Sequence, residues 1–408
     1  MTKATPLSVF RTLDDVDVAG KRVLVRADLN VPMQDERITD ATRIDRILVN
    51  VREISEKKGR VILLSHLGRP TNGPDAKNSL KSVAVEIERK LGCYVAFASD
   101  CVGDVAKSAV RAMRDGDVLL LENTRFHAAE TKNDPAFVDA LAELGDIYVN
   151  DAFATAHRAH ASTEGLAHKL PAYAGRSMQR ELEMLTSMLE NPKRPLAAIV
   201  GGAKVSTKFE LLGNLMHRVE YMFVGGAMAN TFLAASGKEV GTSLYEKSFT
   251  GVAREIMAEA EGANCKLLLP VDAVVASRLA NIRTKIVDID SVGEDQMILD
   301  IGPRSISQAV GLLASARTLV WNGPVGAFET VPFDTGTMSI AKVAAQLTKV
   351  GALETIAGGG DTIAALNCAG VTQDFTYVST AGGAFLEWLE GKQLPGVEAL
   401  RWTSAPAA

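Results

Sequence analysis

Four arginines and a histidine in the first half of the sequence are suited to binding an anion. They are Arg43, His66, Arg69, Arg125 and Arg158. A single arginine is usually an exposed surface charge. Several that converge would repel one another unless an anion lay between them, and guanidinium groups bind carboxylate and phosphate through paired contacts. The group therefore predicts a ligand that carries more than one anionic group.

Two shorter polar residues, Asp28 and Asn30, directly follow the first apolar run of the chain. We expect them to contact neutral hydroxyl groups of the same ligand. Asp28 has a second interpretation as a capping or turn residue close to Pro32. The sequence leaves both interpretations open.

Glycine-rich turns in the second half are suited to binding phosphate. The first is Gly201–Lys208 (GGAKVSTK). Glycines let a ligand approach the backbone, and the start of a helix offers free N–H groups to phosphate. Lys204 and Lys208 are four residues apart, so we expect them on one helix face. The segment lacks the G-x-x-x-x-G-K-[ST] pattern of a P-loop.

A second turn, Gly358–Thr362 (GGGDT), precedes a helix expected at 363–368. Asp361 either caps this helix or faces Mg²⁺ on nucleotide phosphates. Mg²⁺ commonly binds through one or two carboxylates together with phosphate oxygens. Glu329, in another glycine-rich loop, is expected to accept hydrogen bonds from ribose hydroxyls. These features favour a phosphate-bearing ligand in the second half.

Short β-rich runs alternate with helical patterns and would position all of these residues. We expect strands at 21–26, 60–65, 94–98, 118–121 and 147–151, and again at 196–200, 221–224, 266–269, 318–322, 354–357 and 375–378. This alternation indicates two α/β, doubly wound domains with parallel sheets. Ligands bind such sheets beyond the carboxyl ends of the strands, which is where the polar and glycine-rich loops fall.

Breaks in this alternation predict the domain boundaries. We expect an N-terminal domain at 1–175, a connecting helix at 176–192, a C-terminal domain at 193–390 and a tail at 391–408. Asn191-Pro192 and Pro195 would end the connecting helix.

Composition excludes several classes of protein. The chain has 408 residues and a formal net charge of -5, with no basic tail, which argues against nucleic-acid binding. The apolar runs are strand-sized and too short for a membrane helix. Four cysteines occur without a C-x-x-C pair, as expected for free thiols in a reducing compartment. We therefore expect a cytoplasmic protein without a membrane or nucleic-acid partner.

Nine segments together resemble the phosphoglycerate kinase family. They are 25–33 (VRADLNVPM), 65–70 (SHLGRP), 121–126 (LENTRF), 149–160 (VNDAFATAHRAH), 201–208 (GGAKVSTK), 269–274 (LPVDAV), 300–305 (DIGPRS), 320–329 (VWNGPVGAFE) and 358–362 (GGGDT). The matches are collinear from about Val9 to Leu400. The resemblance implies two Rossmann-like domains joined by a helix around a cleft.

The resemblance also implies an activity and residue roles. The reaction would be reversible phosphoryl transfer from 1,3-bisphosphoglycerate to MgADP in glycolysis, giving 3-phosphoglycerate and MgATP, by a monomer. Glycerate would be bound by Asp28, Asn30, Arg43, His66, Arg69, Arg125 and Arg158. Nucleotide would be bound by Lys208, Glu329, Gly359, Gly360, Asp361 and Thr362, with Asp361 on the Mg²⁺ side. Arg43 and Lys204 would stabilise the transferring phosphoryl group.

The sequence departs from the family pattern at Ala154, Ala227 and Ala381, where glycine is usual. We expect activity to survive these single methyl groups. Two other functions would require different sequence features. An NAD-dependent dehydrogenase would need G-x-G-x-x-G after an early strand, which is missing there. A non-catalytic two-domain protein that binds anions would not need the lysines and the GGGDT turn.

Overall fold

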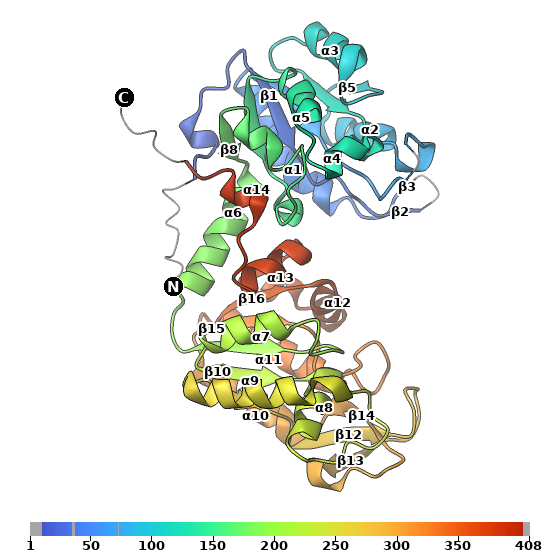
Figure 1. Cartoon of the computed structure of the whole chain (residues 1–408), viewed down its shortest axis with the longest axis vertical. Helices are drawn as coiled ribbons and strands as arrows, with labels where there is room; N and C mark the ends of the chain where they lie inside the picture. The colour runs from blue at the N-terminus through green and yellow to red at the C-terminus, as the bar shows by residue number, and fades with distance from the viewer. Residues whose placement is uncertain (1–9, 35–36, 72, 403–408) are drawn as a thin grey trace. The chain divides into compact units, whose positions relative to one another are not determined.

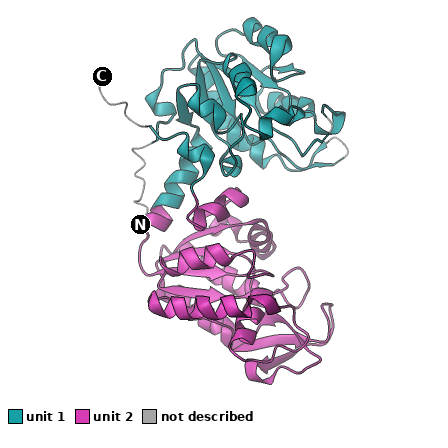
Figure 2. Ribbon diagram, viewed as in Figure 1, with its two compact units in different colours: residues 1–186, 393–408 teal, residues 187–392 magenta. Residues whose placement is uncertain are grey.

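The computed structural model describes residues 10–34, 37–71 and 73–402. Residues 1–9, which include Val9, and 403–408 of the expected tail lie outside the described residues. The chain divides into two compact units (Figures 1 and 2), one of 1–186 with 393–408 and one of 187–392. Both are α/β units built on a parallel sheet, which confirms the expected fold class.

The first unit contains a six-stranded parallel sheet with the order β5-β6-β4-β1-β7-β8. Its strands are β1 (Arg22–Arg26), β4 (Arg60–Leu64), β5 (Val95–Ala98), β6 (Val118–Leu121), β7 (Ile147–Asn150) and β8 (Ala172–Ala174). The central strands are buried along nearly their whole length. A parallel sheet covered on both faces requires such continuous apolar runs. A separate hairpin pairs β2 (Met33–Gln34) with β3 (Arg37–Ile38).

Helices connect these strands. They are α1 (Thr42–Glu56), α2 (Lys81–Leu91), α3 (Gly103–Ala112), α4 (Ala128–Thr131), α5 (Pro135–Ala142) and α6 (Arg176–Leu185), with short 3₁₀ turns η2 (Leu13–Asp15), η3 (Ala76–Asn78), η4 (Thr124–Phe126), η5 (Phe153–Thr155) and η6 (Gly165–His168). Helix α1 buries Ile44, Ile47, Val51 and Ile54 against the sheet. Their spacing of three and four residues places them on one helix face.

The segment from residue 393 onward completes the first unit. It carries the short helix α14 (Pro395–Glu398), which contacts η5. Gly396 donates its N–H to the carbonyl of Ala156 at 2.8 Å. The amide of Asn150, at the end of β7, donates to the Gly396 carbonyl at 3.3 Å. The expected tail is therefore an ordered part of this unit up to residue 402.

The second unit repeats the plan, with the sheet order β11-β10-β9-β15-β16-β17. Its strands are β9 (Leu196–Val200), β10 (Tyr221–Val224), β11 (Lys266–Leu268), β15 (Thr318–Asn322), β16 (Glu354–Gly358) and β17 (Tyr377–Ser379). Its helices are α7 (Phe209–Met216), α8 (Gly226–Ala235), α9 (Thr250–Gly262), α10 (Pro303–Ser315), α11 (Thr335–Lys349), α12 (Gly360–Ala369) and α13 (Gly383–Leu389). Figure 1 shows α7 and α9 on one face of the sheet and α10 and α11 on the other.

A three-stranded antiparallel sheet, β13-β12-β14, also belongs to the second unit and was not predicted. Its strands are β12 (Asp272–Ala276), β13 (Lys285–Asp288) and β14 (Met297–Ile301). Strand β13 is mostly exposed, with Ile286 61% accessible. An exposed edge strand gives no continuous apolar run, so its sequence resembles a loop. Strand β8 was missed for a related reason, since it is only three residues long.

The expected connecting helix is shorter and less regular than its sequence suggests. Helix α6 ends at Leu185, and a π-helical turn (Thr186–Glu190) follows.

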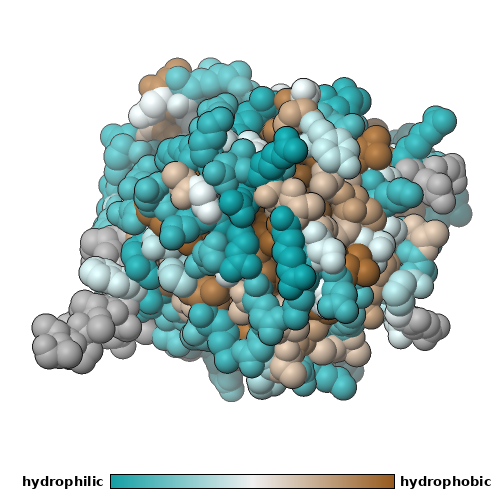
Figure 3. Space-filling view, turned by 90° about the horizontal axis from the view of Figure 1, so that it is seen from above, coloured by the Kyte–Doolittle hydropathy of each residue, from teal (hydrophilic) through white to brown (hydrophobic). Residues whose placement is uncertain are grey.

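The surface drawn in Figure 3 is largely hydrophilic, with apolar residues in small groups. Among the described residues, none of the helices combines the length and apolar character that crossing a bilayer requires.

Candidate functional site

Hydrogen bonds tie together three loops at the carboxyl edge of the first sheet. Asn30, after β1, accepts the N–H of Gly68 on its side-chain oxygen at 2.8 Å. Arg125, after β6, donates from Nη1 to the carbonyl of Gly68 at 2.8 Å. Gly68 lies in the loop after β4. Two of the predicted binding residues therefore share one backbone partner, as expected for neighbouring parallel strands.

Positive charge accumulates around these loops. Burial, together with the charges of Arg158, Arg26 and Arg69, lowers the pKa of Arg125 to about 10. The structure therefore brings together three of the predicted arginines, Arg69, Arg125 and Arg158. These three positively charged guanidinium groups repel one another. A multiply charged anion would relieve this repulsion.

Arg26 is a member of this cluster that sequence reasoning missed. It is the last residue of β1, and only 1% of its surface is exposed. Its Nη2 lies 3.0 Å from Nδ1 of His66, and its Nε donates to the Ser162 hydroxyl at 2.8 Å. Ser162 in turn donates to the buried carboxylate of Glu130 at 2.5 Å. The sequence did contain a signal for its role, because Arg26 is an arginine at the end of an apolar stretch.

Arg26 fixes the protonation state of His66. A guanidinium group can only donate, so Nδ1 of His66 must accept and the ring proton lies on Nε2. Burial lowers the pKa of His66 well below its usual range, with further lowering by Arg26, Arg125 and Arg158. His66 is consequently neutral and suited to donate one hydrogen bond from Nε2. It is not suited to hold a positive charge.

His160 faces the same positive charges and allows a test of this field. Burial, together with the charges of Arg125, Arg158 and Arg26, lowers its pKa to about 4. The unfolded chain would bind this proton near pH 6.5, so His160 favours the folded state above that pH and loses this contribution on acidification. The free energy of unfolding of the parent should therefore fall between pH 7.5 and 5. In His160→Gln this fall should be smaller by about 1 kcal/mol, after allowing for solvent screening.

Urea unfolding at both pH values, without phosphate or sulfate, measures this difference. The buried carboxylates Asp151 and Asp300 act in the opposite direction, because burial raises the pKa of each to about 7. Both are present in the parent and the variant, so their contributions cancel in the comparison. Equal acid sensitivity of the two proteins would contradict the positive field at His160.

Arg43 lies at the start of α1 and pairs with Asp28. Its Nη1 is 2.8 Å from the Asp28 carboxylate. Asp28 also accepts the N–H of Asn30 at 3.3 Å, so the local turn contact considered for it is present. The ion pair leaves Arg43 half-buried, with 34% of its side chain exposed. Asp28 thus orients Arg43, while the rest of the guanidinium edge stays accessible.

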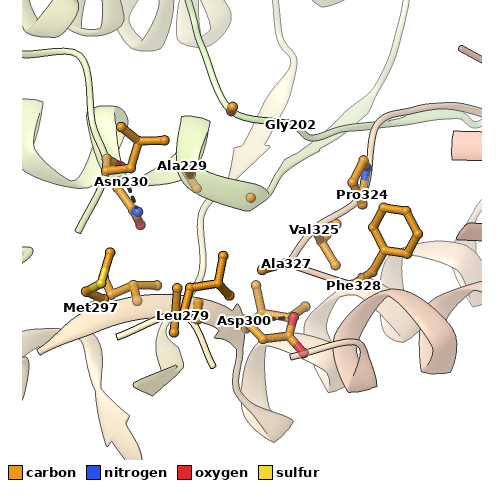
Figure 4. Close-up of a pocket in the computed structure, with 18 of the residues that line it drawn as sticks. Gly202, Ala229, Asn230, Leu279, Met297, Asp300, Pro324, Val325, Ala327 and Phe328 are labelled. Atoms are coloured by element: carbon orange, nitrogen blue, oxygen red, sulfur yellow. Dashed lines mark hydrogen bonds between the residues drawn. The ribbon is translucent and has the colours of Figure 1, made fainter. Parts of the chain in front are cut away.

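A cavity of about 320 Å³ lies within the second unit. Its lining includes Gly202 after β9, Gly226 after β10, and the loop 324–329 after β15. Figure 4 shows Pro324, Val325 and Phe328 on one wall, and Ala229, Asn230 and Met297 on the other. Glu329 and Asp361, both predicted from sequence, line the cavity. A mostly apolar slot with a few acidic groups suits a planar organic ring attached to polar groups.

The two predicted lysines do not share a helix face, so this prediction was wrong. Helix α7 begins only at Phe209, and Lys208 is its N-cap. Backbone bonds from Gly201 and Gly202 to the β15 loop hold this segment in an irregular turn. Lys208 Nζ donates to the carbonyls of Gly201 and Asn322 at 2.6 and 3.1 Å. Burial lowers its pKa to about 8, whereas Lys204 is exposed.

The GGGDT turn starts α12 three residues earlier than expected. Gly359, with φ of 96°, is the N-cap, so Asp361 lies in the first turn and is not the cap. The first repeating helical bond joins the Ile363 N–H to Gly359. The N–H groups of Gly360, Asp361 and Thr362 precede it, where helices commonly bind phosphate. Asp361 is exposed, and its charge acts on Lys208.

Thr362 has a structural partner that sequence reasoning did not foresee. Its hydroxyl accepts the N–H of Gly323 at 2.7 Å and donates to the Gly358 carbonyl at 2.8 Å. It therefore ties the β15 loop to the start of α12. Its side chain positions the turns, and its backbone N–H is the group left for a ligand.

Asp300 is a second residue that sequence reasoning missed as a site residue. It is the next-to-last residue of β14, lines the cavity, and accepts the N–H groups of Ile301 and Gly336 at 2.9 and 2.7 Å. Burial raises its pKa to about 7. Its segment was noted only for its family resemblance, because a single Asp in an apolar run is not distinctive. Asp300 fixes the wall formed by the unpredicted antiparallel sheet.

The chain was compared with known proteins. The family model described as "Phosphoglycerate kinase" matches residues 13–392. A phosphoglycerate kinase of Methylorubrum extorquens is 62% identical over 394 residues, covering 96% of this chain and 98% of that protein. One of Xanthobacter autotrophicus is 60% identical over 396 residues, covering 97% and 100%.

Solved structures agree with the sequence matches. The phosphoglycerate kinase structure from Coxiella burnetii has a TM-score of 0.90 and 43% identity, covering 96% of this chain and 98% of that chain. That from Pyrococcus horikoshii OT3 has a TM-score of 0.79 and 30% identity over the same shares. The fold, the placement of the basic and glycine-rich loops, and these similarities lead to one assignment: the chain belongs to the phosphoglycerate kinase family.

Proposed function

We propose that this protein transfers a phosphoryl group reversibly between 1,3-bisphosphoglycerate and MgADP, giving 3-phosphoglycerate and MgATP in glycolysis. One observation carries the assignment of the glycerate to the first unit. Arg125 and Arg158 act on a neutral His66, and burial together with the charges of Arg158, Arg26 and Arg69 lowers the pKa of Arg125. A ligand with a carboxylate and phosphates matches such a cluster.

Within this proposal the first unit binds glycerate through the seven predicted residues. His66 donates a hydrogen bond from Nε2, and Asn30 is held by its bond to Gly68. The arginines bind the anionic oxygens. Arg43, oriented by Asp28, provides charge for the phosphoryl group that is transferred.

The second unit binds the nucleotide. The apolar slot accommodates the adenine ring, and Glu329 at its edge accepts from the ribose hydroxyls. The phosphates lie at the start of α12, near Gly359, Gly360 and Thr362, with Lys208 close by. Lys204 is exposed on the preceding turn, so it is available to contact the transferring group.

Asp361 fits the role of a Mg²⁺ ligand. It is an exposed carboxylate that lines the cavity at a helix N-terminus. Mg²⁺ prefers oxygen ligands and usually keeps several waters beside one or two carboxylates and the phosphates. When bound, the cation would neutralise phosphate charge and help to orient the nucleotide.

The chemistry requires no nucleophile from the protein. An oxygen of the ADP β-phosphate attacks the acyl phosphate, and the carboxylate of 3-phosphoglycerate leaves. Such transfers pass through a loose transition state, so catalysis depends mainly on positioning and charge neutralisation. Since acyl phosphate and ATP would otherwise hydrolyse, a closing movement that excludes water is part of the proposal.

A coupled assay tests the proposal. ATP consumption should depend on 3-phosphoglycerate, and NADH oxidation by added glyceraldehyde-3-phosphate dehydrogenase reports the product. The alternative is a non-catalytic protein that binds anions. If calorimetry detected both ligands but ATP were not consumed, that alternative would stand in place of the kinase.

Gly226 provides a structural test of the nucleotide cavity. A Cβ at this position would lie 2.6 Å from the Gly202 carbonyl oxygen and 3.0 Å from that of Pro324. Its φ of +69° also disfavours other residues. Gly226→Ala should displace the turns on either side of the cavity. We expect the Kd for ADP to rise about tenfold or more, equivalent to ~1.4 kcal/mol.

Gly213→Ala is the matched control. Gly213 lies in α7 of the same unit, and its added Cβ would meet nothing within 4 Å. This substitution should leave ADP binding unchanged and stabilise the helix by about 0.5–1 kcal/mol. Calorimetric titration of both variants with ADP measures the effect. Unchanged binding in Gly226→Ala would count against the cavity as the nucleotide site.

The proposal includes a cytoplasmic monomer. All four cysteines, Cys93, Cys101, Cys265 and Cys368, are free thiols, as is usual in a reducing compartment. Light scattering of the purified protein measures its mass in solution. A mass near 43 kDa supports the monomer.

A further inference from the structure

Three potential metal ligands meet in the first unit, and the proposed reaction uses none of them. They are Asp100, Cys101 and His127, and one ligand atom from each lies within 4.8 Å of the other two. Within the described part of the chain, this is the one such group of three or more His, Cys, Asp and Glu side chains. We call it the Asp-Cys-His cluster.

Two neighbouring strands place these residues together. Asp100 and Cys101 follow β5 and precede α3, while His127 follows β6 and the short η4 turn. Strands β5 and β6 are adjacent and parallel, so the loops after them emerge at the same edge of the sheet. The sheet topology therefore brings the cluster together, although His127 is 27 positions from Asp100 and 26 from Cys101 in sequence.

The ligand atoms are held by contacts within the protein. Oδ1 of Asp100 lies 2.7 Å from Nε2 of His127 and also accepts the Cys101 N–H at 2.7 Å. The His127 ring lies against Phe137, with 5.1 Å between ring centroids. These contacts limit the rotation of both side chains, which reduces the entropy lost when they bind a common partner.

The burial of the three residues differs in a way that suits metal entry. Cys101 is 1% exposed. The side chains of His127 and Asp100 are 32% and 41% exposed. The thiol thus forms the floor of the cluster, and the imidazole and carboxylate form an opening through which an ion can enter and keep a water ligand.

The donor set selects the class of metal. A cysteine sulfur and an imidazole nitrogen favour Zn²⁺ and similar transition metals, whereas Mg²⁺ prefers oxygen alone. Three protein ligands plus water complete a tetrahedral Zn²⁺ site. With the thiolate and carboxylate ionised, the ligands carry two negative charges, which a divalent cation balances.

We propose that Asp100, Cys101 and His127 form a Zn²⁺ site separate from the Mg²⁺ bound with the nucleotide. On binding, the S–H bond of Cys101 breaks, its proton passes to solvent, and a Zn–S bond forms. The Nε2 proton of His127, which Asp100 accepts in the metal-free protein, moves to Nδ1 by exchange with solvent, and the ion takes the place of this hydrogen bond. No electron transfer is involved, and neither substrate takes part.

Cobalt substitution of the full chain tests this site directly. The protein is freed of metal with a chelator and titrated with Co²⁺, which gives a near-ultraviolet charge-transfer band only when a thiolate binds it. We expect one Co²⁺ per chain, displaced by a stoichiometric amount of Zn²⁺ and unaffected by millimolar Mg²⁺. Cys101→Ser and His127→Gln should each abolish the band or weaken Co²⁺ binding at least tenfold.

Two control variants come from the same unit. Cys93→Ser removes an exposed thiol, and His168→Gln removes an imidazole that lies 2.7 Å from Glu164. Both should retain the band. Circular dichroism tests whether each variant is folded. If Cys101→Ser does not fold, Cys101→Ala provides a second test.

The opposite results would overturn the proposal. No band in the parent protein, binding only at millimolar Co²⁺, or a band lost in Cys93→Ser but kept in Cys101→Ser would each exclude the site. The readout is metal binding and not turnover, so its failure leaves the kinase proposal unaffected.

Discussion

Arg43→Ala is expected to lower kcat for 3-phosphoglycerate phosphorylation by more than about 100-fold, the usual cost of losing one donor to transition-state charge. Arg43 is half-buried and held by Asp28 at 2.8 Å, so its guanidinium has a defined direction. The substitution removes positive charge that is most needed in the transition state, when the phosphoryl group lies between the attacking and leaving oxygens. The KM for 3-phosphoglycerate should change much less than kcat.

Steady-state kinetics with both substrates varied separate these two effects. Arg52→Ala is the matched control, because Arg52 is on the same helix, is exposed, and bonds only the Lys90 carbonyl among the described contacts. It should keep the parental kcat. Arg43→Lys retains charge without the planar fork and should recover part of the lost rate. If kcat of Arg43→Ala matched that of Arg52→Ala, Arg43 would have no catalytic role.

Asp361→Asn is expected to raise the Kd for MgADP about tenfold or more, equivalent to ~1.4 kcal/mol. The amide has the shape of the carboxylate but lacks the charge that a Mg²⁺ ligand needs. Without Mg²⁺, ADP should bind the variant as well as the parent, or better, since one negative charge near the phosphates is gone. Calorimetric titration with and without a chelator measures both values.

The fold should tolerate this substitution. Gly359 is the N-cap of α12, and the Asp361 side chain makes no cap hydrogen bond. Loss of its favourable charge in the first turn should cost only about 0.3–1 kcal/mol. Asp374→Asn is the control, because Asp374 lies on the 3₁₀ turn η10 (Thr372–Asp374) of the same unit and pairs with Lys349 at 2.9 Å. Equal MgADP affinity in both variants would argue that Asp361 serves only the helix.

The sequence allowed prediction of the two parallel sheets because their central strands are continuous apolar runs. Residues 23–25 and 62–64 are fully buried, and such short apolar runs are typical of a parallel sheet covered on both faces. The loops that follow them were located by the same reasoning. Short or exposed strands were missed, since β8 and β13 lack that periodic signal.

Within the candidate site, the sequence correctly placed side chains that follow neighbouring strands, while their binding roles stay predictions. The convergence of Arg69 and Arg125 followed from the edge they share. Arg26, by contrast, acts through a buried chain to His66 and Ser162, which depends on contacts 40 and 136 residues apart. The prediction that Lys204 and Lys208 share a helix face was wrong. The backbone N–H groups of the preceding glycines bond to the end of β15 and its loop, so this segment is an irregular turn and the helix starts only after it.

The segment after residue 392 has a consequence for synthesis. Residues 187–392 form a continuous unit, whereas the first unit needs α14, whose Gly396 bonds Ala156. Translation proceeds from the amino end, so residues 10–186 are synthesised first, but η5 gains its contact with α14 only when almost the whole chain has been made. The first unit therefore begins synthesis first and yet cannot acquire all of its native contacts until the end of synthesis, at about the same time as the second unit.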